Sequence, residues 1–180
     1  MACKLNIYLI GLSGTGKTRS GQLAAELLGW PFVEMDGVIE DRAGKTIPNI
    51  FKDNGEEYFR DLESQILEEV AKRGGRIVST GGGVPIRSQN RETMNSTGLV
   101  IRLTASAQTI HERLAVSSKR RGRSLRPLLG NDAPIQKIEN MMIAREKGYS
   151  SAKITVDTEH KSHQQVAKMI IKVWRNSELA

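Results

Sequence analysis

The sequence predicts an α/β domain in which strands and helices alternate around a largely parallel sheet. Short apolar runs rich in β-branched residues alternate with amphipathic segments of helical period, which is typical of βαβ units. The first apolar run leads directly into a glycine-rich segment, and a helical pattern follows it. The length of 180 residues suits one domain, and 38% hydrophobic residues are ordinary for a globular protein. Helices are therefore expected on both faces of the sheet.

The predicted elements begin with a strand and a helix on either side of the glycine-rich segment. The apolar run LNIYLIG at residues 5–11 predicts a buried strand. Residues 17–29 place leucines and alanines at helical spacing and predict a helix that ends at Gly29. PFVEMD at residues 31–36 predicts a second short strand. Residues 36–50 are mixed, with helical signals around GVIEDRAG.

The rest of the chain continues the alternation. An amphipathic helix is expected at residues 55–75. The elements expected after it are the strand RIVST, the strand TGLVIRLTA, the helix SAQTIHERLAV, the helical segment APIQKIENMMIAREKGYSSA, the strand KITVDT and the helix SHQQVAKMIIKVWRNSELA. We expect the final helix, with Trp174, to pack on the sheet rather than on a partner. Residues 117–132 have few apolar side chains and predict a mobile flap, with a solvated surface loop as the alternative.

Composition and charge exclude several classes of protein. The single cysteine, Cys3, excludes a framework of disulfides within the chain, which fits a reducing compartment. No apolar stretch approaches the roughly 20 residues that a membrane-spanning helix needs, and the first residues are too short for a signal peptide. We therefore expect a cytoplasmic protein with no membrane partner. The net charge of +7 is compatible with binding either nucleic acid or small polyanions such as ATP.

The glycine-rich segment matches the phosphate-loop pattern G-x-x-x-x-G-K-[ST] without exception. Glycines let the backbone bend so that N–H groups point at phosphate oxygens, and the next helix adds the positive end of its dipole. Lys17 is expected to reach the β- and γ-phosphates, and the Thr18 hydroxyl to coordinate Mg²⁺. The expected nucleotide-binding residues of the loop are Gly11, Ser13, Gly14, Thr15, Gly16, Lys17 and Thr18.

Two acidic residues stand at the end of the second predicted strand, where parallel sheets bind ligands. Asp36 could orient or deprotonate a substrate hydroxyl, or it could cap the helix that follows. Glu34 is expected on the same strand face, where it could hold a water on Mg²⁺. The residues alone leave the two roles of Asp36 open.

Two further patterns point to an acceptor site. Arg60 and Glu63 are three residues apart on a predicted helix, so Glu63 either steadies Arg60 for a substrate carboxylate or forms an ordinary surface ion pair. Gly81, Gly82 and Gly83 directly follow a predicted strand. A turn needs one or two glycines, so three predict that something approaches the backbone closely. Their N–H groups could bind a substrate oxygen or the γ-phosphate.

The order of these motifs resembles the shikimate kinase family. The motifs in order are the phosphate loop, EMDGVIE, GEEYFRDLE, STGGGV, SLRPLL and REKGYSSA, and the resemblance covers about residues 5–158. Many families share the phosphate loop, whereas the combination of FR..E, GGG and RPLL is more specific. It implies a three-layer α/β/α sandwich around a five-stranded parallel sheet, of P-loop kinase type with a mobile lid. It also implies ATP and Mg²⁺ as cofactors, and transfer of the γ-phosphate to the 3-hydroxyl of shikimate in the biosynthesis of chorismate and aromatic amino acids.

The resemblance also implies roles for particular residues. Lys17, Asp36 and Arg126 would be the catalytic residues, with Asp36 at the shikimate hydroxyls and Arg126 closing over the phosphates. Arg113 would stack near the adenine. Arg60 and Arg145 would bind the substrate carboxylate. The implied substrate-binding residues are Asp36, Arg60, Gly81, Gly82, Gly83 and Arg145.

Two departures from the family pattern are visible. Glu34-Met35-Asp36 stands where the family usually has Asp-x-Asp, so a contact of Glu34 with Mg²⁺ through water would be shifted or absent. The segment between Arg113 and Arg126 is longer and more basic than the family pattern. Whether its residues 117–125 screen phosphate or face solvent stays open.

As a whole, the chain is expected to form one P-loop kinase domain over residues 1–180, with a lid at about 114–132 and a shikimate-binding region at 34–62. We expect a monomer that binds shikimate and no nucleic acid. The alternatives are another small P-loop metabolite kinase such as a gluconate kinase, a nucleotide-dependent nucleic-acid-binding protein, and a homologue that has lost activity. The aromatic content of 4% argues against nucleic acid, and the candidate catalytic residues argue against lost activity.

Overall fold

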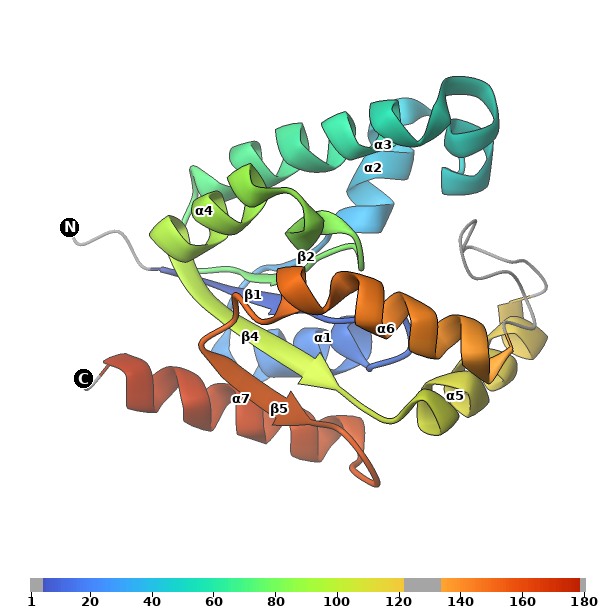
Figure 1. Ribbon diagram of the computed structural model, residues 1–180. Helices are drawn as coiled ribbons and strands as arrows, with labels where there is room; N and C mark the ends of the chain where they lie inside the picture. The colour runs from blue at the N-terminus through green and yellow to red at the C-terminus, as the bar shows by residue number, and fades with distance from the viewer. Residues whose placement is uncertain (1–4, 122–133, 179–180) are drawn as a thin grey trace.

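Figure 1 shows the computed structural model, which describes residues 5–121 and 134–178. Five parallel strands form one sheet in the order β2-β3-β1-β4-β5. The strands are β1 (Asn6–Ile10), β2 (Phe32–Glu34), β3 (Ile77–Ser79), β4 (Gly98–Thr104) and β5 (Ile154–Asp157). The helices are α1 (Lys17–Leu28), α2 (Met35–Ala43), α3 (Ile47–Ala71), α4 (Ser88–Thr97), α5 (Ala107–Arg121), α6 (Ile135–Tyr149), α7 (His163–Glu178) and the short 3₁₀ helix η1 (Val84–Ile86). The predicted α/β fold with a five-stranded parallel sheet is confirmed.

Helices cover both faces of the sheet (Figure 1). α1 and α7 pack on the face to which Ile7 and Leu9 of β1 point. α2, α3, α4 and α6 pack on the other face, to which Tyr8 and Ile10 point. Because successive side chains of a strand point to opposite faces, a strand covered on both sides must be apolar throughout most of its length. This explains why the continuous apolar run of β1 correctly predicts a buried strand.

The strand order brings three functional segments to one edge of the sheet. β1 lies between β3 and β4, and β3 lies between β1 and β2. The strands are parallel, so the segments that follow β1, β2 and β3 leave the sheet side by side at their carboxyl ends. These segments are the phosphate loop, the start of α2 and the glycine triplet Gly81–Gly82–Gly83, which we call the triplet.

Several helices differ from the sequence-based expectation. α3 begins at Ile47, inside the segment interpreted as mixed, and is interrupted at Gly55, whose φ of 85° favours glycine. α4 was not predicted, because its sequence is mostly polar and buries only Asn90 and Met94. α5 continues to Arg121, so the first part of the predicted flap is helical. The remainder of that flap lies outside the described residues. Within the described ranges, no helix combines the length and apolar character that crossing a membrane requires.

α7 packs on the sheet through Trp174, as the sequence predicted. Trp174 is 4% exposed, and its ring meets Trp30 edge-on with 5.3 Å between the ring centroids. We expect Trp174→Ala to lower the free energy of unfolding by about 3–5 kcal/mol, because it removes a buried aromatic side chain and leaves a cavity. Urea denaturation would measure this loss. Leu27→Ala is the control, since Leu27 is 61% exposed, and a loss as small as that of the control would contradict the prediction.

Candidate active site

The loop between β1 and α1 has the backbone shape of a phosphate cradle. Gly11, Gly14 and Gly16 have φ values of 138°, 91° and 92°, a region that favours glycine. A Cβ on Gly11 would collide with the carbonyl oxygen of Leu103, so the loop also needs glycine there to pass close to β4. Gly16 caps the amino end of α1, which places the positive end of the helix dipole at the loop. This geometry fits a bound phosphate group, as the motif predicts.

Lys17 and Thr18, the next residues, point to the same region. Lys17 is 7% exposed. Its Nζ donates to the carbonyl oxygens of Gly11 at 2.7 Å and Leu12 at 3.1 Å. The Thr18 hydroxyl lies 3.3 Å from the Ser79 hydroxyl at the end of β3. In the described part of the chain, no three His, Cys, Asp or Glu side chains gather into a metal site. The Thr18 hydroxyl is an oxygen ligand of the kind that suits Mg²⁺, together with phosphates and water.

Glu34 and Asp36 lie differently from the prediction. They do not share a strand face, because β2 ends at Glu34 and Asp36 lies in the first turn of α2. Glu34, not Asp36, caps this helix, and its Oε2 accepts from the Gly37 N–H at 2.9 Å. Burial and the nearby Asp36 raise the pKa of Glu34. The N-cap alternative for Asp36 is therefore wrong, and its carboxylate instead lies against the triplet.

The triplet brings the acidic and basic candidates together. A Cβ on Gly81 would lie 2.6 Å from Glu63 Oε1 and 2.8 Å from Asp36 Oδ1. On Gly82 it would lie 3.1 Å from Arg145 Nη1 and 3.6 Å from the Gly11 carbonyl oxygen, and on Gly83 it would overlap the Arg60 guanidinium. The sequence-based prediction that something approaches these glycines closely is confirmed. The close neighbours in the structure are side chains of α2, α3 and α6.

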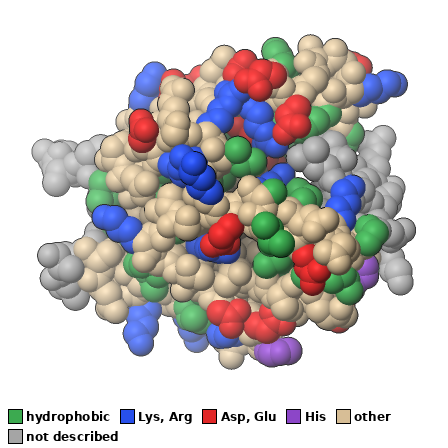
Figure 2. All heavy atoms as spheres, viewed as in Figure 1, with side chains coloured by type: hydrophobic (Ala, Val, Ile, Leu, Met, Phe, Trp, Pro, Cys, Tyr) green, Lys and Arg blue, Asp and Glu red, His purple; other side chains and the backbone are tan. Residues whose placement is uncertain are grey.

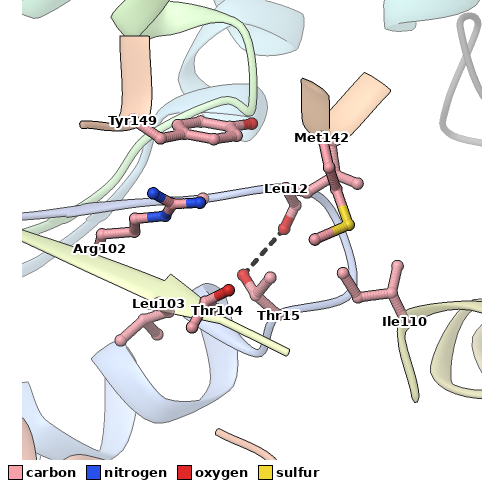
Figure 3. Close-up of a pocket in the computed structure, with 9 residues that line it drawn as sticks. Leu12, Thr15, Arg102, Leu103, Thr104, Ile110, Met142 and Tyr149 are labelled. Atoms are coloured by element: carbon pink, nitrogen blue, oxygen red, sulfur yellow. Dashed lines mark hydrogen bonds between the residues drawn. The ribbon is translucent and has the colours of Figure 1, made fainter. Parts of the chain in front are cut away.

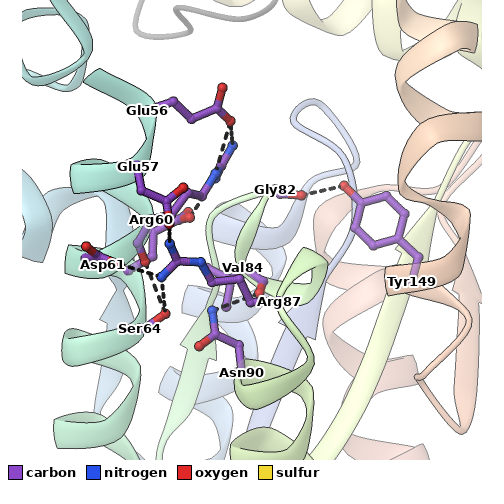
Figure 4. Close-up of polar contacts among 11 residues, drawn as sticks. Glu56, Glu57, Arg60, Asp61, Ser64, Gly82, Val84, Arg87, Asn90 and Tyr149 are labelled. Carbon is purple, nitrogen blue, oxygen red and sulfur yellow. Dashed lines mark hydrogen bonds and ion pairs between the residues drawn. The ribbon is translucent and has the colours of Figure 1, made fainter.

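Arg60 and Glu63 form a buried pair rather than a surface one. They are 7% and 1% exposed, and Arg60 Nη1 donates to Glu63 Oε2 at 2.6 Å. Glu56 accepts from Arg60 Nη2 at 2.8 Å on the solvent side (Figure 4). Burial raises the pKa of Glu63 to about 7 despite the opposing effect of Arg60. The surface-pair alternative is wrong, and Glu63 steadies Arg60 beside Gly83.

Arg113 of α5 connects the phosphate loop to the loop after β5. Its guanidinium donates to the Thr158 carbonyl oxygen at 2.7 Å and to the Gly14 carbonyl oxygen at 3.4 Å. The Glu159 carboxylate accepts from the backbone N–H of Ser106 at 2.8 Å, just before α5 begins. Arg113 therefore borders the phosphate loop, and its role beside the adenine stays a prediction. Arg126, the predicted lid arginine, lies outside the described residues.

The molecular surface is hollowed between α3 and α6, and basic and acidic side chains gather there (Figure 2). A pocket lies behind the phosphate loop, between β4, α5 and α6 (Figure 3). Its lining is Gly11, Leu12, Thr15, Arg102, Leu103, Thr104, Ile110, Met142 and Tyr149. Lys17, Asp36 and Arg60 do not line this pocket.

Sequence reasoning missed two polar residues at the site. Ser79 lies beside Thr18, and Tyr149 donates its hydroxyl hydrogen to the Gly82 carbonyl oxygen at 2.7 Å. The strand signal RIVST contained Ser79, and the motif REKGYSSA contained Tyr149. Only the three-dimensional contacts distinguish them from ordinary strand and helix residues.

Comparison with known proteins gives a consistent result. The model of the family described as shikimate kinase matches residues 13–175. A shikimate kinase from Symbiobacterium thermophilum is 38% identical, over 93% of this chain and 94% of its own length. One from Persephonella marina is 40% identical, over 92% of this chain and 96% of its own. The structure of shikimate kinase from Acinetobacter baumannii in complex with shikimate superposes with a TM-score of 0.88, at 34% identity, covering 98% of this chain and 96% of that one.

The buried pair makes a prediction about stability and pH. The pKa of Glu63 is raised from 4.5 to about 7 on folding, so the folded state binds more protons than the unfolded state between these values. The resulting contribution to the free energy of unfolding, on the order of 1–3 kcal/mol, is present at low pH and is lost as pH rises through about 7. Glu63→Gln cannot titrate and should lack it.

Denaturant titrations of both proteins across this pH range would measure the effect. The stability of the natural protein minus that of Glu63→Gln should fall as pH rises. A difference that stays constant with pH would contradict the raised pKa, whatever the absolute stability of the variant.

Proposed function

The chain belongs to the shikimate kinase family, and from this premise we propose that it transfers the γ-phosphate of ATP to the 3-hydroxyl of shikimate. Members of the family are ATP-dependent kinases that phosphorylate a hydroxyl of shikimate. The single observation that best supports the proposal for this chain is the triplet, whose glycines lie close to Asp36, to Arg60 and Arg145 and, at Gly82, also to the phosphate loop. Such an arrangement suits a donor phosphate and a carboxylate-bearing alcohol held side by side.

The donor half of the proposed site is built from the phosphate loop and α1. The backbone N–H groups of the loop and the amino end of α1 would hold the phosphates. Lys17 would exchange its carbonyl acceptors, Gly11 and Leu12, for oxygens of the β- and γ-phosphates. Thr18 would ligate Mg²⁺, with Ser79 beside it. When bound, this ion offsets the charge of the β- and γ-phosphates.

The acceptor half is built from α2, α3, α6 and the triplet. Arg60 and Arg145 would bind the carboxylate of shikimate, since guanidinium groups match carboxylates in charge and geometry. Gly82 and Gly83 lie between these arginines, so the backbone of the triplet would contact the ring of the substrate. Asp36 would accept a hydrogen bond from the 3-hydroxyl and direct its oxygen to the γ-phosphorus.

The chemistry proposed for this site depends mainly on position and electrostatics. Asp36 orients the attacking hydroxyl and accepts its proton as the new O–P bond forms. Lys17 offsets the negative charge that develops as the bond to ADP breaks. The proposal includes Arg126 as a second cation at the phosphates and Arg113 beside the adenine. It also includes closure of a lid at about residues 114–132, which would exclude water.

Several finer points are part of the same proposal. Glu34 would reach the Mg²⁺ shell only through water, because its Oε2 caps α2. The chain would work as one domain over residues 1–180, with a shikimate-binding region at 34–62, and as a monomer without a nucleic-acid or membrane partner. Family membership does not favour the gluconate kinase alternative. A panel of polyol substrates would separate the two.

Asp36→Asn tests the role of the carboxylate. Asn keeps the size of the side chain but is a poor proton acceptor, so we expect kcat to fall by about 10²–10⁴-fold. A coupled assay of ADP release with shikimate and Mg-ATP measures this fall. Binding of ATP to the variant should be unchanged, which calorimetry would check. Turnover close to that of the natural protein would refute the role of Asp36, and no shikimate-dependent turnover by the natural protein would refute the function.

Gly83→Ala tests the close contact between the triplet and Arg60. A Cβ at this position would overlap the guanidinium, so Arg60 must move away. We expect the KM for shikimate to rise about tenfold or more, as for the loss of one charged hydrogen bond, and the KM for ATP to change little. Gly29→Ala is the control for backbone strain without a steric clash, because its φ of 66° disfavours alanine while its Cβ would meet nothing within 4 Å. An equal effect in both variants would contradict the prediction.

A further inference from the structure

Tyr149, the last residue of α6, makes a contact that the proposed roles do not use. Its hydroxyl donates to the carbonyl oxygen of Gly82 at 2.7 Å (Figure 4). The side chain is 3% exposed, and burial raises the pKa of its hydroxyl. Tyr149 is therefore protonated at neutral pH and acts as a hydrogen-bond donor at the middle residue of the triplet.

This contact fixes a peptide unit that would otherwise turn easily. Glycine populates a wide range of φ and ψ, so consecutive glycines allow the plane between them to rotate. A peptide unit is planar and trans, so its C=O and N–H point in opposite directions. Holding the Gly82 carbonyl oxygen toward α6 therefore directs the Gly83 N–H away from α6. Gly83 is the residue whose missing Cβ makes room for Arg60.

Tyr149 is itself held from the sheet side. The guanidinium of Arg102, on β4, lies 5.5 Å from the centre of the Tyr149 ring, as Figure 3 shows from the side. The same guanidinium donates to both carboxylate oxygens of Glu146 on α6, each at 2.7 Å. A two-pronged pair of this kind restricts orientation as well as distance. The ring of Tyr149 is thus fixed before any ligand binds.

The end of α6 is also in close contact with the segment after the triplet. A Cβ on Gly148 would lie 2.7 Å from the carbonyl oxygen of Pro85, so glycine at this position lets α6 approach η1. Arg145 lies one helical turn before Tyr149, and residues four apart share a helix face. Tyr149 and Arg145 therefore meet Gly82 from the same helix.

We propose that Tyr149 is a positioning residue for the acceptor site, which holds the Gly82–Gly83 peptide so that Arg60 and Arg145 keep the spacing that a substrate carboxylate requires. The inference rests on the proposed function, because it presumes that these arginines bind the substrate. It goes beyond that function because it assigns the spacing of Arg60 and Arg145 to the Tyr149 hydroxyl, which is not one of the proposed substrate-binding groups. The residue acts through the backbone of the triplet and also through Arg145, with which its hydroxyl interacts directly.

Another buried tyrosine offers a matched control. Tyr8 is fully buried, and its hydroxyl lies 2.8 Å from the Thr97 hydroxyl and accepts from Asn6 Nδ2 at 3.1 Å. These contacts join the start of β1 to the end of α4, away from the carboxyl ends of the strands. Tyr8→Phe and Tyr149→Phe each remove one buried hydroxyl, but only the second removes a contact with the triplet.

The experiment compares the two variants with the natural protein. For Tyr149→Phe we expect the KM for shikimate to rise about tenfold, because the Gly82 carbonyl loses its donor, while kcat and the KM for ATP stay within about threefold. Tyr8→Phe should leave the KM for shikimate within about twofold. Amide hydrogen exchange measured by NMR should become faster at Gly83 in Tyr149→Phe only.

The outcomes separate this inference from the proposed function. If the natural protein turns over shikimate and the two variants have the same KM, Tyr149 has only a structural role and the inference fails. If the natural protein shows no shikimate-dependent turnover, the proposed function fails. The exchange rate at Gly83 then decides whether Tyr149 holds the peptide. Should Tyr149→Phe not fold, Arg102→Met releases the same ring from the sheet side, and an unchanged KM for shikimate in that variant overturns the inference.

Discussion

The arrangement of the charged side chains around the triplet depends on one steric constraint, the absence of Cβ atoms at three consecutive positions. Each glycine of the triplet makes room for a different neighbour: Gly81 for Asp36 and Glu63, Gly82 for Arg145, and Gly83 for Arg60. These neighbours come from α2, α3 and α6. A side chain at any of the three positions would push one of these groups away. The triplet is therefore the point at which the spacing of the charged residues is set.

The sheet determines where the triplet lies relative to the phosphate loop. β3 pairs with β1, so the residues that follow both strands emerge as neighbours. Thr80 reinforces this pairing, because its N–H and its hydroxyl donate to the Leu9 carbonyl oxygen at 3.1 and 3.0 Å. A bound phosphate at the loop and a ligand at the triplet would thus be neighbours by backbone pairing alone. The side chains then need to supply only charge and orientation.

The features that could be predicted from the sequence are those in which a local sequence pattern is compatible with only one structure. The apolar run of β1, the phosphate loop and the close approach to the glycines belong to this class. The position of Asp36 was missed because strand and helix signals overlap at MDGVIE. The N-cap residue of α2 is Glu34 and not Asp36. α4 was missed because its helix buries little apolar surface. The contact of Tyr149 with Gly82 joins residues 67 positions apart, and no local pattern encodes such a pairing.

The buried pair of Arg60 and Glu63 has an electrostatic consequence for ligand binding. If both groups were ionised, the charges of Arg60 and Glu63 would largely cancel. The cost of removing both ions from water can also exceed their mutual attraction, so a buried ion pair need not stabilise the fold. The pKa of Glu63 is raised to about 7 because burial favours the protonated state of its carboxyl group. In that state the charge of Arg60 is only partly compensated, by the half-exposed Glu56. The guanidinium therefore keeps its fixed position while remaining attractive to an incoming carboxylate, which an ordinary surface ion pair would not provide.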